Sequence, residues 1–108
     1  MDRVVFVYTN YPSAVEAEKA ARTMVHQRLA ACANIIPGMV SHYWWDDKVE
    51  RAEETVVLFK TRASLAEAVR EAIKKSHPYQ TPAILVLPIE SVDAPYLKWL
   101  LAETEPRA

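Results

Sequence analysis

The chain has 108 residues, a length that supports one compact domain rather than two. Hydrophobic residues make up 51% and charged residues 25%, a balance that excludes an intrinsically disordered chain. The formal net charge of -1 argues against nucleic acid as a partner, because phosphate binding needs a clustered excess of cations. We therefore expect a single domain over residues 1–108.

The first quarter of the chain predicts a strand followed by a helix. Residues 4–8 are β-branched or aromatic throughout, which is typical of a central strand buried on both faces. Ser13 stands three residues before Glu16 in a capping box, so a helix should begin just after Ser13. Small apolar side chains such as Ala17 and Ala21 then recur every four residues, so this helix can lie close on a sheet.

The middle of the chain predicts a long β-hairpin. Residues 33–45 and 49–61 are apolar and β-prone, and a polar turn at 46–48 separates them. Pro37 removes a hydrogen-bond donor and Gly38 permits unusual dihedral angles, so we expect a bulge or bend at these two residues.

This hairpin is too long for one subunit. Each arm has about twelve residues and would span about 40 Å, more than the diameter implied by a radius of gyration of roughly 13 Å. Its far end carries Tyr43, Trp44 and Trp45, which a solvated tip would expose. We expect neighbouring copies in a closed ring to cover these three residues as an oligomer interface. The alternative is that the rings fold back onto their own domain.

The second half of the chain predicts a helix, a strand and a last short helix. Ser64 and Glu67 form a second capping box, and that helix should end near residues 76–78. Residues 84–89 predict a strand, and the last helix begins near Asp93. Its inward-facing residues are expected to be Tyr96, Leu97, Leu100 and Leu101.

The order of these elements predicts the fold class. Strand, helix, strand, strand, helix and strand, followed by a terminal helix, form the α+β, ferredoxin-like split βαβ pattern. This pattern gives one antiparallel sheet with two helices packed on one face.

Several features argue against secretion, membrane insertion and catalysis. The apolar run at 4–8 is shorter than a signal-peptide core, and no run approaches the roughly 18 residues of a membrane helix. Cys32 has no partner for an internal disulfide, so we expect a cytoplasmic protein. Its position between two alanines favours a small buried thiol over a nucleophile. Without a recognisable nucleophile or phosphate-binding motif, we expect no enzyme.

Histidines and carboxylates are the candidate metal ligands. His26 is expected to be solvated or half-buried, and His42 in the hairpin is expected at an interface. His77 stands where a helix should end, so it either caps that helix or contacts a ligand or metal ion. Hairpin carboxylates could hold a hard cation loosely, although solvated surface charges are the favoured interpretation. They are Asp46, Asp47, Glu50, Glu53 and Glu54.

Longer motifs carry a family resemblance. They are Arg28–Gly38, Tyr43–Trp45, Leu58–Arg62, His77–Pro82, Leu87–Ile89 and Tyr96–Trp99. In this order, and over essentially the whole chain, they resemble the CutA divalent-cation tolerance protein family. The resemblance implies a small cytoplasmic protein of ferredoxin-like fold that forms a stable homotrimer and contributes to tolerance of copper and other divalent metal ions.

The resemblance carries over a metal site only in part. Copper binding in the family is associated with a Cys at the end of the first strand and two consecutive His before Pro-Tyr. Thr9, Ser76 and His77 stand at those positions here, so one ligand of three survives. Because the lost thiolate and imidazole are the donors that favour copper, we expect weak copper binding through His77 with carboxylates, waters or a neighbouring subunit.

A second hypothesis is a signalling or scaffold trimer, similar in architecture to the nitrogen-regulatory PII proteins. Asn10, Lys60, His77 and Tyr79 could meet where strand ends approach helix ends and form a cleft for a small anionic metabolite between subunits. Ordinary loop hydrogen bonding by the same four residues is the alternative.

Overall fold

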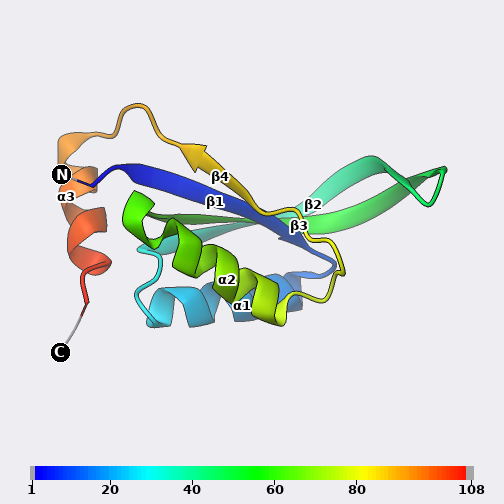
Figure 1. The fold of residues 1–108 in the computed structure, drawn as a ribbon, viewed down its shortest axis with the longest axis horizontal. Helices are drawn as coiled ribbons and strands as arrows, with labels where there is room; N and C mark the ends of the chain where they lie inside the picture. Colours follow the sequence, from blue (N-terminus) through cyan, green and yellow to red (C-terminus); the bar gives the residue numbers. More distant parts are fainter. Residues whose placement is uncertain (1, 107–108) are drawn as a thin grey trace.

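The computed structural model describes residues 2–106 and contains one four-stranded antiparallel sheet with three α-helices (Figure 1). The elements in chain order are β1 (Val4–Tyr11), α1 (Ala14–His26), β2 (Cys32–Trp45), β3 (Lys48–Arg62), the 3-10 turn η1 (Ala63–Leu65), α2 (Ala66–Ser76), β4 (Leu85–Pro88) and α3 (Ala94–Glu103). The strand order across the sheet is β2-β3-β1-β4. This arrangement confirms the predicted α+β, ferredoxin-like fold.

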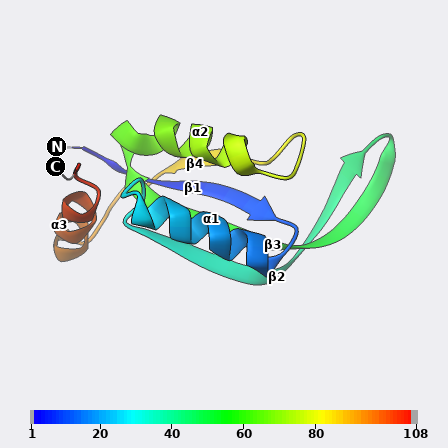
Figure 2. The same cartoon turned by 90° about the horizontal axis from the view of Figure 1, so that it is seen from below.

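Helices α1 and α2 cover the same face of the sheet (Figure 2). Side chains of a strand alternate between the two faces, and those that point toward these helices are buried. Val7, Val57 and Phe59 are fully buried there and pack with Val69 and Ile73 of α2. The alanines of α1 complete this cluster, and their small size lets the helix lie close on the sheet, as predicted.

The two predicted capping boxes have different outcomes. The Ser13 hydroxyl caps α1 as predicted, because it accepts a hydrogen bond from the Glu16 amide at 3.3 Å. The prediction of a second capping box at Ser64 and Glu67 is wrong. The Ser64 hydroxyl donates to the Asp2 carboxylate instead, and α2 begins at Ala66 without a side-chain cap. A charged carboxylate is the stronger acceptor, so it holds the hydroxyl away from the helix end.

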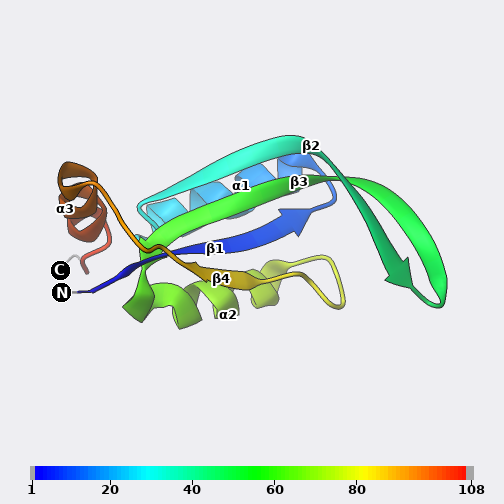
Figure 3. The same ribbon diagram turned by 90° about the horizontal axis from the view of Figure 1, so that it is seen from above.

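Helix α3 packs against the other face of the sheet, at the end remote from the hairpin (Figure 3). Leu100 is fully buried there with Val4 and Ala31. Tyr96 is exposed, so the prediction that it faces inward is wrong. Its hydroxyl lies 3.5 Å from the Cys32 sulfur at the rim of this cluster.

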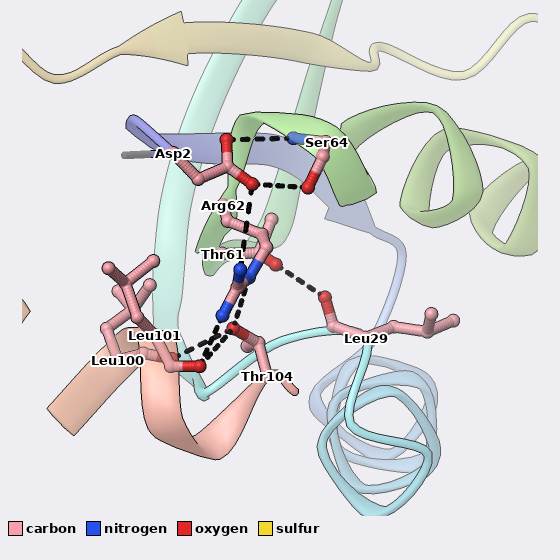
Figure 4. A network of polar contacts seen from close by, with 8 residues as sticks. All are labelled: Asp2, Leu29, Thr61, Arg62, Ser64, Leu100, Leu101 and Thr104. Atoms are coloured by element: carbon pink, nitrogen blue, oxygen red, sulfur yellow. Dashed lines mark hydrogen bonds and ion pairs between the residues drawn. The ribbon is translucent and has the colours of Figure 1, made fainter. Parts of the chain in front are cut away.

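Arg62, at the end of β3, fastens the C-terminal end of α3 to the sheet (Figure 4). Its guanidinium donates to the Leu101 carbonyl and, at 2.9 Å, to the Thr104 hydroxyl. On its other side it lies 3.8 Å from the Asp2 carboxylate. Hydrogen bonding from Ser64, with a smaller contribution from the Arg62 charge, lowers the pKa of Asp2. The cation thus binds a carbonyl in the last turn of α3, at the helix end that favours positive charge.

The hairpin of β2 and β3 extends well beyond the other strands (Figure 3). Toward the hairpin tip, Thr55 is the last β3 residue that pairs with β1. Between Thr55 and the tip, β2 and β3 pair only with each other. The predicted bulge lies between Ile36 and Met39, where Gly38 has a φ of 80°. The molecule measures 46 × 29 × 22 Å, so the hairpin makes it much longer than it is thick.

The face opposite α1 and α2 carries exposed apolar side chains wherever α3 does not reach. Ile36 of β2 is 49% exposed and Leu87 of β4 is 41% exposed. Near the hairpin tip, Trp44 is 74% and Trp45 is 52% exposed. The alternative that these rings fold back onto their own domain is therefore wrong for the single chain. We call this face, together with the part of the hairpin that extends beyond β1, the open face.

Candidate functional site

A cleft of about 750 Å³ lies between the part of the hairpin that extends beyond β1 and the loop that follows α2. The lining residues are Asn10 from β1, Val40, Ser41, His42, Tyr43, Trp45 and Glu54 from the hairpin, and Pro78, Tyr79, Gln80, Thr81 and Ala83 from the loop. Cavities of about 300–1,000 Å³ hold small molecules in other proteins, so this cleft is large enough for an organic ligand.

The cleft receives Asn10 because β1 is longer than predicted. The strand continues past residue 8 to Tyr11, and Asn10 pairs with Val56 of β3. Residues 9–11 therefore belong to strand β1 of the sheet rather than to a loop. This extension places the Asn10 side chain at the base of the hairpin.

Glu54 and Tyr79 join the two walls of the cleft. The Tyr79 hydroxyl donates to the Glu54 carboxylate at 2.7 Å. Burial, reinforced by this hydrogen bond, raises the pKa of Tyr79, so the phenol stays protonated and remains a donor at neutral pH. Glu54 is only 9% exposed, which makes the prediction of a solvated surface charge wrong for this residue.

His77 sits behind the cleft, and both of its ring nitrogens form hydrogen bonds with other residues of the chain. Its Nε2 lies 2.7 Å from the Asn10 carbonyl oxygen, and its Nδ1 lies 3.1 Å from the Tyr79 amide nitrogen. Because a carbonyl only accepts and an amide only donates, the ring is assigned as the neutral tautomer with the proton on Nε2. The His77 amide also binds the Ile73 carbonyl as the C-cap of α2.

Tyr11 packs against the ring of His77. Its ring stacks on His77 with centroids 4.5 Å apart. The Tyr11 hydroxyl is buried and has no hydrogen-bond partner within residues 2–106. Burial, with the nearby Glu16 charge, raises the pKa of Tyr11 to about 12. The ring therefore holds His77 by packing, while its hydroxyl contributes no bond.

Comparisons with known proteins identify the family. A family model described as CutA1 divalent ion tolerance protein matches residues 5–103. The chain belongs to the CutA1 family. This finding confirms the resemblance inferred from the sequence motifs.

Individual CutA relatives match nearly the whole chain. The divalent-cation tolerance protein CutA of Pyrococcus horikoshii is 41% identical over 102 residues, which cover 94% of this chain and 99% of that protein. The crystal structure of CutA1 from Oryza sativa has a TM-score of 0.93 and 36% identity, and the match covers 98% of this chain and 97% of that one. A structure described as the periplasmic divalent cation tolerance protein CutA from Archaeoglobus fulgidus has a TM-score of 0.91 and 38% identity over 94% of this chain and 99% of that one.

The positions linked to copper in the CutA family do not form a metal centre in this chain. Thr9 is buried, and the Ser76 hydroxyl donates to the Ala72 carbonyl at 3.4 Å. Both His77 nitrogens are already hydrogen-bonded. Within residues 2–106, no three His, Cys, Asp or Glu side chains lie close enough together to hold a metal ion. Residues 2–106 of a single chain therefore do not by themselves bring together a cluster of copper ligands.

Three of the four residues predicted to form a ligand site do come together. Asn10 and Tyr79 line the cleft, and His77 is hydrogen-bonded to both. Lys60 lies apart, because it pairs with Phe6, four residues along β1 from Asn10. Its Nζ lies 5.1 Å from the centroid of the Phe6 ring.

The remaining candidates lie in varied environments. His26 is exposed at the end of α1, and His42 is exposed and lines the cleft. Cys32 is half-buried beside the Tyr96 hydroxyl, so the prediction of a core thiol is wrong. None of the helices within residues 2–106 has the length and apolarity needed to cross a membrane.

Glu54 is the cleft residue whose role the sequence reasoning missed. It directly precedes the buried run 55–57, and a carboxylate adjoining such a run is a candidate for burial. That signal does not reveal Tyr79 as its partner, because 25 residues separate the two in the chain.

Proposed function

We propose that this chain is a divalent-cation tolerance protein that acts as a homotrimer in the response to divalent metal ions. The observation that carries the proposal is the match of the CutA1 family model to residues 5–103. The proposal assigns binding rather than catalysis to the chain, because the sequence contains no recognisable motif of a nucleophile with an adjacent base.

The open face supports the homotrimer. Apolar side chains such as Ile36, Leu87 and Trp44 gain stability only when another molecule covers them. β2 and β4 are the two edge strands, and their unpaired backbone groups can pair with a neighbouring chain. Cyclic symmetry would let three copies satisfy these requirements without leaving a free edge.

Light scattering coupled to size-exclusion chromatography tests the assembly. A homotrimer gives a mass three times the chain mass of 12.3 kDa at micromolar concentration. A mass equal to that of one chain would contradict the assembly and leave the exposed tryptophans unexplained.

For the metal, the proposal is weak copper binding at His77. To coordinate copper, the ring must give up its hydrogen bond with the Asn10 carbonyl or with the Tyr79 amide. That loss supports weak rather than tight binding, with the other ligands coming from carboxylates, waters or a neighbouring subunit.

Titration calorimetry with copper(II) tests this assignment. The His77→Ala variant should lose the binding heat, while the His26→Ala variant, changed at an exposed histidine, should keep it. An unchanged isotherm for His77→Ala would show that His77 is not a ligand.

The cleft favours a second candidate function, a PII-like trimer that binds a small metabolite. The sequence suggested that Asn10, Lys60, His77 and Tyr79 form a cleft for an anionic metabolite, but Lys60 is not among the residues that line the cleft. A thermal-shift screen of small metabolites tests this function, because a specific ligand raises the unfolding temperature by mass action. A screen without any stabilising compound would count against it.

The proposed location is the cytoplasm, on the basis of the sequence features given above. The Archaeoglobus fulgidus relative is described as periplasmic, so the location needs a direct test. Fractionation of the source cells should recover the protein with cytoplasmic markers, and recovery with periplasmic markers would contradict the proposal.

A further inference from the structure

The cleft between the hairpin and the loop after α2 carries charge of one sign. Among its lining residues, Glu54 is the only Asp or Glu. No Lys or Arg of the described chain lines the cleft. An anionic ligand would therefore meet a carboxylate without a compensating cation.

Glu54 is a nearly buried carboxylate whose charge is not balanced. It is 9% exposed, and the Tyr79 hydroxyl is its only hydrogen-bond partner within residues 2–106. None of the ion pairs between described residues includes it. Burying a carboxylate without a cation is costly, so a positive group that enters the cleft would relieve that cost.

The surroundings of Glu54 strengthen this preference. Burial and the Glu54 hydrogen bond raise the pKa of Tyr79 most, and the charges of Glu54 and Glu16 raise it further. Glu54 thus faces the Tyr79 phenol without a Lys or Arg among the residues that line the cleft. The rings of Tyr43 and Trp45 also line the cleft, and the faces of aromatic rings attract cations.

We infer that the cleft binds a small organic cation, with a protonated amine against Glu54 and an apolar body against Tyr43 and Trp45, two rings that the proposed homotrimer also places at the interface between copies. A volume of about 750 Å³ is far larger than a bare metal ion needs and suits a small organic molecule. The inference rests on the second proposed function, the binding of a metabolite in this cleft, and names the chemical class of that metabolite.

Three probes of nearly equal shape test the charge preference on the assembled protein. They are 2-phenylethylamine as the cation, 2-phenylethanol as the neutral analogue and phenylacetate as the anion. Calorimetric titration should give binding for the amine, at least tenfold weaker binding for the alcohol and none for the anion. This series needs no variant, so a folding defect cannot obscure its result.

Two variants then test the role of Glu54. Glu54→Gln keeps the shape but removes the charge, and it should weaken amine binding at least tenfold. Glu53→Gln removes the adjacent exposed charge and should bind the amine like the parent chain. The mass of the assembly, measured for each variant, should stay unchanged.

Each contrary result has a distinct meaning. Binding of phenylacetate in preference to the amine would overturn the cation inference while leaving the cleft as a ligand site. Absence of binding for all three probes would overturn both the inference and the metabolite function. If Glu54→Gln dissociates the assembly and the parent binds no probe, the partner of Glu54 is a neighbouring subunit, and the inference is wrong.

Discussion

The two faces of the sheet are built from alternate residues of the same strands, yet they differ in how completely one chain covers them. Toward α1 and α2, Val57 and Phe59 are fully buried. On the open face, Ile36 and Leu87 keep 49% and 41% of their surface exposed. One face therefore stabilises the single chain, whereas the other offers apolar surface to a neighbouring molecule. Stability and assembly should respond to different substitutions.

The largest expected effect is at the helix-covered face. Phe59→Ala removes a fully buried ring and should lower the free energy of unfolding by about 3–5 kcal/mol. Urea denaturation followed by circular dichroism measures this change. A loss below about 1 kcal/mol would show that this face is not the main source of stability.

The second-largest loss of stability is expected at the end of the sheet that α3 covers. Arg62→Met removes the hydrogen bonds to the Leu101 carbonyl and the Thr104 hydroxyl, and should cost about 2 kcal/mol. Hydrogen exchange should become faster in α3 but remain unchanged in α1. Equal acceleration in both helices would mean that Arg62 supports the whole fold rather than the α3 contact.

A substitution on the open face should separate assembly from folding. Leu87→Asp places a charge on an exposed apolar position of β4, so it should reduce the measured mass toward that of one chain. The stability of the single chain should change by only about 0.5 kcal/mol. Val15→Asp, on the exposed surface of α1, is the matched control and should leave the mass unchanged. Equal masses for both variants would contradict the role of the open face.

A further small effect on stability is expected at Tyr11, whose buried ring stacks on His77. Tyr11→Phe removes a hydroxyl without a partner in the described chain, so the free energy of unfolding at pH 7 should rise by at most about 1 kcal/mol. A decrease of similar size would indicate that the hydroxyl has a partner, such as a buried water.

Tyr11 also predicts a dependence on alkaline pH. Its pKa is raised from 10 to about 12 in the folded chain, so folding favours the protonated phenol. The resulting stability is complete below pH 10 and is lost as the pH rises toward 12. Tyr11→Phe should reduce this alkaline loss, and the difference between the two unfolding profiles from pH 9 to 12 measures it. Identical profiles would contradict the raised pKa.

Local sequence patterns were sufficient for most of the architecture. Strand and helix periodicity, the Ser13 cap and the Pro37-Gly38 bulge depend on residues close together in the chain, and the structure agrees with each. The Ser64 cap failed because Asp2, 62 residues away in the chain, takes the hydroxyl. A local pattern cannot anticipate a stronger acceptor brought in by the fold.

The candidate site was less predictable than the fold. Asn10, His77 and Tyr79 were correctly placed near one another, because strand and helix ends meet at one edge of this fold. Lys60 was misplaced, since its distance from Asn10 depends on the exact register of β1 against β3. Register also decides which hairpin carboxylate reaches the cleft, and so the sequence could not separate Glu54 from Glu53.

By itself, the sequence indicated the family, because its motifs resemble those of CutA proteins. It also determined the order of elements and a hairpin that extends beyond the other strands, because these follow from periodicity and chain length. Only the tertiary structure decided that Glu54 is buried against Tyr79 and that both His77 nitrogens are occupied. The physical reason is that the charge and hydrogen bonding of a side chain depend on neighbours that only the folded chain brings within a few ångströms.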